Sequence, residues 1–121
     1  MPCSTDPMTG FFRDGYCRTD GNDHGSHTVC AQITNDWLAQ QASVGNNLAT
    51  PHPQYGFPGL KEGDYWCVCA IRWRQAFWAG ATAKVKLDAT NRAALNLVEE
   101  HYLRQSSDDC LNNGNSQNMD L

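Results

Sequence analysis

The stretch that decides the fold is YWCVCAIRWRQAFWAG, residues 65–80. Its first five residues are aromatic, β-branched or thiol-bearing, a composition that favours a short strand. The next ten carry Ile71, Trp73, Phe77 and Trp78 and are followed by Gly80, a common helix terminator. We therefore expect a strand at 65–69 that leads directly into a helix at about 70–79.

Upstream of this stretch the sequence predicts a second strand and a second helix. Apolar and polar residues alternate over 28–34, as in a half-buried strand, which would place Cys30 on the more polar face. Thr34 is a suitable N-cap for a helix that follows this strand, and Gly45 is its natural end.

Downstream, a third strand and a last helix are expected. Alternation returns at Val85 and Leu87, and Asp88 or Thr90 can cap a helix. Helical spacing then continues through Ala94, Leu97, Val98 and Tyr102.

The remaining segments are rich in turn-forming residues. Residues 1–28 and 46–64 contain many Gly, Pro, Asp and Asn residues and show no sustained period. Residues 105–121, which include Cys110, have almost nothing apolar to bury and are expected to form a disordered tail. The prediction is an α+β fold: a single domain at 1–104 with about three short strands, three short helices and long irregular loops.

Composition excludes several classes of protein. The net charge is −4, with nine basic residues that form no cluster, so a nucleic-acid partner is not expected. No apolar stretch approaches the roughly 18 residues of a membrane span, and the first residues lack the basic and apolar regions of a signal peptide. We expect a cytoplasmic protein with no membrane partner.

Cysteine is the most informative residue type. The six cysteines in 121 residues amount to about five per cent, below the roughly 8–10% of secreted disulfide scaffolds, so reduced thiols are expected. The simplest interpretation of each thiol is a small buried core residue.

A metal site is the functional alternative. If 65–69 is extended, Cys67 and Cys69 share a face with β-carbons about 6–7 Å apart, too far for a disulfide between them. They could instead share zinc or iron. The further candidate ligands are Cys30, Cys17, Cys3, His27 and His24, although no C-x2-C spacing is present.

Two other groups of side chains are candidates. Residues 20–27 concentrate Asp, Asn and His, but they lack the glutamate of an EF-hand and are most simply a solvated turn. His27 and Cys30 would face opposite ways on one strand, so a Cys–His pair between them needs a bulge. Arg72 lies near the start of a predicted helix, where it could help to bind an anion. Three further candidate ligand-binding residues lie on irregular segments. These residues are Arg13, Tyr55 and Lys61.

The chain resembles the DUF2237 family of small bacterial proteins, a domain of unknown function. The motifs that carry the resemblance are PCSTDPMTGFFRDG (2–15), HTVCA (27–31), TP (50–51), YGFPGLK (55–61), GDYWCVCA (63–70), RW (72–73) and DAT (88–90). They occur in order from about Pro2 to Leu103. Family members often have a second cysteine where this chain has Tyr16. The resemblance implies no activity, cofactor or catalytic residue.

Three functions remain open from the sequence. The first is a pocket lined by thiols, aromatic rings and Arg72 that acts as a metal or redox site. The second is a noncatalytic module that binds a small ligand, an anion or a peptide through the loop 46–64, with structural cysteines. The third is an interaction protein, such as a homodimer. No serine triad, phosphate-binding loop or dinucleotide motif supports a common enzyme class.

Overall fold

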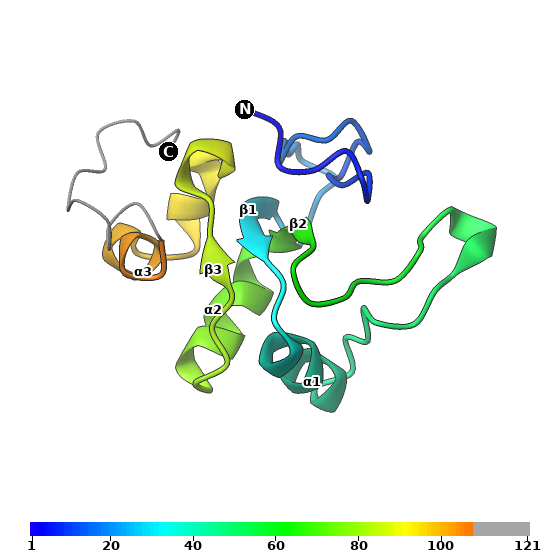
Figure 1. The fold of residues 1–121 in the computed structure, drawn as a ribbon. Helices are drawn as coiled ribbons and strands as arrows, with labels where there is room; N and C mark the ends of the chain where they lie inside the picture. Colours follow the sequence, from blue (N-terminus) through cyan, green and yellow to red (C-terminus); the bar gives the residue numbers. More distant parts are fainter. Residues whose placement is uncertain (108–121) are drawn as a thin grey trace.

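The computed structural model describes residues 1–107, which form a three-stranded antiparallel sheet packed against helices (Figure 1). The strand order is β2-β1-β3, with the smallest strand at one edge. The α+β prediction is confirmed. The elements are β1 (His27–Gln32), α1 (Asn35–Ser43), η1 (Pro53–Tyr55), β2 (Tyr65–Cys69), α2 (Ala70–Trp78), β3 (Lys84–Val85), η2 (Leu87–Ala89), η3 (Arg92–Asn96) and α3 (Glu100–Gln105).

The junction between β2 and α2 is as abrupt as the sequence predicts. Cys69 ends the strand with an extended backbone (φ −59°, ψ 130°), and Ala70 begins the helix. Helix α2 packs against β1 and β2 and buries Ala70, Trp73 and Ala76. The Trp73 indole N–H donates to the Ala83 carbonyl at 3.0 Å, which ties the helix to the chain that enters β3.

Helix α1 follows the predicted start signal. The Thr34 hydroxyl accepts a hydrogen bond from the Trp37 N–H at 3.1 Å, as an N-cap does, and Asp36 lies in the first turn. The helix ends at Ser43, two residues before Gly45, whose φ of +87° lies in the left-handed region.

Both faces of the sheet are covered. The main core lies on one face of the sheet. It contains Val29 and Ala31 from β1 and Trp66 and Val68 from β2. The alternate residues, Cys30 and Cys67, belong to a second buried cluster with Cys3, Cys17 and Ala89. The N-terminal segment supplies two of those cysteines and lies beside β1 and β2 (Figure 1). Cys30 lies on the face opposite Val29 and Ala31, as expected, but this face is buried, because the irregular N-terminal segment covers it.

The last helix is shorter than expected. Thr90 is not its cap, because the Thr90 hydroxyl accepts from the Cys30 N–H and donates to the Lys86 carbonyl. Asn91 instead caps the short η3 turn, with its side chain accepting from the Ala93 N–H, and α3 begins only at Glu100.

Regular and buried structure extends past the predicted domain boundary at residue 104. Helix α3 extends to Gln105, and Ser107 is buried and bridged to Val85. The rest of the predicted tail, with Cys110, lies outside the described residues.

Candidate functional site

Cys69 is the free cysteine in the part of the chain that the structure describes. It is half-buried and occupies the N-cap position of α2, where β2 ends. Its side chain makes no capping hydrogen bond to the helix. The sulfur is therefore not engaged by the helix that it precedes and is available to other groups.

His27 lies directly beside this sulfur. It is the first residue of β1 and pairs with Cys69 across the antiparallel ladder, and a register shift follows between His27 and Val29. The Nε2 atom of His27 lies 3.2 Å from the Cys69 sulfur, which is within hydrogen-bond reach. The bulge that a Cys–His pair was expected to need is present between His27 and Val29. The cysteine beside His27, however, is Cys69 and not Cys30.

Asp23 holds the other side of the His27 ring. One carboxylate oxygen lies 2.6 Å from His27 Nδ1, and the other accepts the His27 backbone N–H at 2.8 Å and the Thr19 hydroxyl at 3.0 Å. The Asp23 side chain is 1% exposed. The His27 ring thus lies between the Cys69 thiol and the Asp23 carboxylate. This is the order of groups found in catalysts that combine a nucleophile, a base and an orienting carboxylate.

The electrostatics of the three groups are coupled. The hydrogen bond to Cys69 is the main cause that raises the pKa of His27 from 6.5 to about 9; Asp23 adds to the shift and burial opposes it. Burial favours a higher pKa for Asp23, but hydrogen bonds from the His27 N–H and ring and from Thr19 outweigh it and lower this pKa. At neutral pH His27 is therefore an imidazolium that can donate to both neighbours.

The turn that carries Asp23 and His27 is fitted closely to Cys69. Ser26 has φ +55°, an uncommon conformation that costs a non-glycine residue about 1–3 kcal/mol. The Ser26 carbonyl accepts the Ala70 N–H at 2.9 Å and so joins the turn to the first turn of α2. A β-carbon on Gly25 would lie 2.7 Å from the Cys69 sulfur. Only glycine leaves room for the sulfur here.

A small cavity of about 50 Å³ opens next to the sulfur. The Trp37 indole N–H is buried and has no hydrogen-bond partner among the described residues. Trp37 is one of the residues that line this cavity, and a buried donor without a protein partner is expected to meet an acceptor on a bound molecule or water. The walls are His27, Trp37, Asn46, Leu48, Trp66, Val68, Cys69 and Arg72.

The four predicted ligand-binding residues do not converge. Arg72 lines the Cys69 cavity, and the Arg13 guanidinium lies over the Trp66 ring, 5.2 Å from its centre, close to one wall. Tyr55 is 79% exposed on η1. Lys61 lines a separate hollow of about 280 Å³ with Asp6 and Asp64.

Six of the seven candidate metal ligands are divided between two places. His27 and Cys69 form the site above, whereas Cys3 is bonded to Cys30 and Cys17 to Cys67. The expectation of reduced thiols is wrong for these four in this structure. As predicted, Cys67 and Cys69 are not bonded to each other. His24 is exposed and lies outside both groups.

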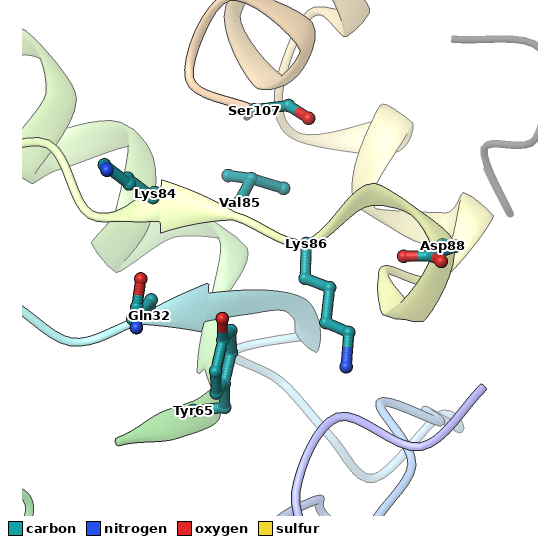
Figure 2. A pocket seen from close by; sticks show the side chains of 7 residues that line it. All are labelled: Gln32, Tyr65, Lys84, Val85, Lys86, Asp88 and Ser107. Carbon is teal, nitrogen blue, oxygen red and sulfur yellow. The ribbon is translucent and has the colours of Figure 1, made fainter. Parts of the chain in front are cut away.

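A third hollow, of about 230 Å³, lies at β3 (Figure 2). Its lysines do not converge in Figure 2: the Lys84 side chain points away from Lys86, which runs down beside Tyr65. The Lys86 ammonium lies 5.3 Å from the centre of the Tyr65 ring. This hollow lacks the aligned reactive groups found at Cys69.

Cys69 and His27 could be identified as candidates from the sequence, but their pairing and the position of Asp23 were not predicted. The available signal was the polar run 20–27, whose last residue, His27, begins β1 opposite Cys69 at the end of β2. The prediction of a solvated turn is wrong for Asp23. This side chain can be buried because Thr19 and His27, in the same turn, form hydrogen bonds with both of its oxygens.

No helix among residues 1–107 has the length and apolar character needed to cross a membrane. No curated protein matches the sequence. The family model described as "Uncharacterized protein conserved in bacteria (DUF2237)" matches residues 1–107, which is the whole of the described structure. The expected resemblance is confirmed, and the chain belongs to the DUF2237 family.

Proposed function

We propose that this protein is a thiol-dependent catalyst in which Cys69 is the nucleophile, His27 its acid and base, and Asp23 the residue that positions His27. The observation that carries the proposal is the continuous contact from the Cys69 sulfur to His27 Nε2 (3.2 Å) and from His27 Nδ1 to Asp23 (2.6 Å). This arrangement is recognised by geometry and roles on unrelated folds.

The chemistry that fits is acyl transfer. The Cys69 thiolate attacks the carbonyl carbon of an ester, thioester or amide, and a carbon–sulfur bond forms while the carbonyl electron pair moves to oxygen. His27 donates its Nε2 proton to the leaving group, which departs as a neutral molecule. Neutral His27 then takes a proton from water, which attacks the acyl-enzyme and releases the acid and Cys69.

Hydrogen-bond donors are available for the oxygen that gains charge. The first N–H groups of a helix have no intrahelical acceptor, and in α2 the first of them, that of Ala70, donates to the Ser26 carbonyl. The N–H groups of Ile71 and Arg72 therefore face the same end as Cys69. The unpartnered Trp37 indole N–H at the cavity wall is an independent second donor site.

The cavity limits what can react. At about 50 Å³ it admits only a small acyl group, and two buried tryptophans, Trp37 and Trp66, are among the residues that line it. Arg72 favours a substrate with a negative group near the reacting carbonyl. The loop 46–64 contributes Asn46 and Leu48 to the cavity, so the loop proposed for ligand binding and the thiol belong to one site.

The test combines alkylation with ester hydrolysis. In a Cys110→Ser background with the disulfides intact, iodoacetamide should modify Cys69 selectively, and small activated esters should leave an acyl group on Cys69 that mass spectrometry detects. Cys69→Ser should abolish both results, and His27→Asn should slow acylation by about 10²-fold or more. His101→Asn, which changes an exposed histidine that contacts Glu99 and the Tyr102 ring, is the matched control.

Two results would overturn the proposal. One is equal alkylation and acylation rates in the wild type and in His27→Asn. The other is full ester hydrolysis in Cys69→Ser, which would show that another group performs the chemistry.

A further inference from the structure

Four cysteines from separate parts of the sequence meet in one buried cluster, away from the Cys69 cavity. Cys3, Cys17, Cys30 and Cys67 are each at most 4% exposed. The sulfurs of Cys3, Cys17 and Cys67 all lie within 4.8 Å of one another, and the Cys30 sulfur is bonded to that of Cys3. The two disulfides are therefore side by side.

The sheet fixes two of the four sulfurs. Cys30 and Cys67 are direct partners across β1 and β2. Their N–H groups donate to buried threonine hydroxyls, of Thr90 at 3.1 Å and Thr9 at 2.8 Å, and not to each other. They form a pair whose side chains lie close together on the face covered by the N-terminal segment.

The N-terminal segment supplies the other two sulfurs from one compact loop. The N–H groups of Cys3 and Ser4 both donate to the Gly15 carbonyl, at 2.7 and 3.3 Å, which holds Cys3 beside the chain that leads to Cys17. Gly15 has φ +90°, and a β-carbon there would lie 3.2 Å from the Ser4 carbonyl oxygen. The loop thus presents two thiols to the sheet through its own backbone contacts, independently of the disulfides.

We propose that, when reduced, these four cysteines form a tetrathiolate site for a thiophilic divalent cation such as Zn²⁺. Tetrahedral zinc with bonds of about 2.3 Å needs sulfurs about 3.8 Å apart. Three of the four sulfurs already lie within 4.8 Å of one another, so only small side-chain movements separate the two states. A ligand set made only of buried thiolates selects soft cations over Mg²⁺ or Ca²⁺.

The disulfide form is converted into the metal-bound form in two steps. Each disulfide takes two electrons and two protons from a dithiol reductant, which leaves as its own disulfide. The four thiols then bind one Zn²⁺ and release four protons. In a reducing cytosol, the location expected from the sequence, the metal would replace the disulfides as the anchor of residues 1–26.

The probe is Co²⁺, added to the full chain as the Cys69→Ser/Cys110→Ser variant, in which only the four cysteines remain. After anaerobic reduction and removal of the reductant, we expect one Co²⁺ per chain. Its spectrum should show thiolate-to-metal charge transfer and the strong visible bands of tetrahedral cobalt, and Zn²⁺ should displace it. Near-ultraviolet circular dichroism of the tryptophans, recorded on the same sample, reports whether the binding chain is folded.

Further variants define the ligands. In the same background, Cys3→Ser and Cys17→Ser should each weaken Co²⁺ binding at least tenfold and reduce the charge-transfer intensity. The proposal is overturned if the four-cysteine chain shows no thiolate charge transfer, or if it binds Co²⁺ only after its tryptophan signal is lost. It is also overturned if binding appears only when Cys69 is present, which would place the metal at Cys69 and His27. None of these outcomes bears on nucleophilic attack by Cys69, which is tested in the oxidised chain.

Discussion

His27 is the residue on which the proposed chemistry depends, because both of its ring nitrogens have partners of opposite character. Asp23 accepts at Nδ1 and is almost completely buried, whereas Cys69 lies at Nε2 on the cavity side. A buried carboxylate cannot easily rotate away, so it fixes the ring plane and directs Nε2 toward the sulfur. The pKa of about 9 makes His27 a proton donor at neutral pH, as a departing group requires.

The raised pKa of His27 predicts how stability depends on pH. A group whose pKa is higher in the folded state stabilises that state fully below its ordinary pKa, here 6.5, and loses this contribution as pH rises through about 9. The difference in free energy of unfolding between the wild type and His27→Asn should therefore be largest below pH 6.5 and shrink up to pH 9. Urea unfolding at a series of pH values measures it; a difference that is constant or grows with pH would contradict the assignment.

Asp23→Asn tests the positioning residue. The variant keeps the shape of the side chain but removes the charge that faces the ring, so the pKa of His27 should fall and Cys69 should be acylated about tenfold more slowly or worse. The His27 pKa is measured by NMR titration of the ring protons. Asp36→Asn, on the exposed first turn of α1, is the control and should change neither quantity. An unchanged His27 pKa in Asp23→Asn would show that Asp23 has only a structural role.

At the scale of elements, the site is made where the turn before β1 meets the junction of β2 and α2. The junction could be predicted, because aromatic and β-branched residues before Ala70 give way to helical spacing after it. The turn could not, because nothing in its composition distinguishes a solvated Asp-rich turn from one whose carboxylate points inward. The same limit explains Thr90, which has the chemistry of a helix cap but is used to bond the Cys30 N–H.

Gly25→Ala tests the fit between this turn and α2. Because the added β-carbon would lie 2.7 Å from the Cys69 sulfur, the sulfur or the turn must move, and the distance to His27 should change. We expect iodoacetamide to react with Cys69 about tenfold more slowly or worse, since displacements of about 1 Å can cost far more than that in rate. Gly21→Ala is the matched control, because a β-carbon there meets nothing within 4 Å. Equal rates in the two variants would mean that the turn does not shape the site.

At the scale of the whole molecule, the irregular first quarter of the chain is held by covalent bonds rather than by regular structure. The cysteine content averaged over all 121 residues predicts reduced thiols. The average conceals that four of the six converge on one face of the sheet, a fact that depends on the path of a segment with no periodicity. The absence of a disulfide between Cys67 and Cys69 could be predicted, because the geometry of a strand alone forbids a bond between them.

The two disulfides should differ in their contribution to stability, and this can be measured in the oxidised, metal-free protein. They join residues 27 and 50 apart in sequence, so the entropy of loop closure predicts about 3.5 kcal/mol for Cys3–Cys30 and about 4 kcal/mol for Cys17–Cys67. Guanidinium unfolding of the double serine variants at each pair should show losses of this order, with the larger loss at Cys17–Cys67. Because Cys17–Cys67 ties the N-terminal segment to the strand that ends at Cys69, its loss should also reduce the rate of Cys69 acylation. If either double variant kept wild-type stability, the bonds would not be the anchor of the N-terminal segment, and contacts such as the hydrogen bond from the Cys67 N–H to the Thr9 hydroxyl would have to hold it instead.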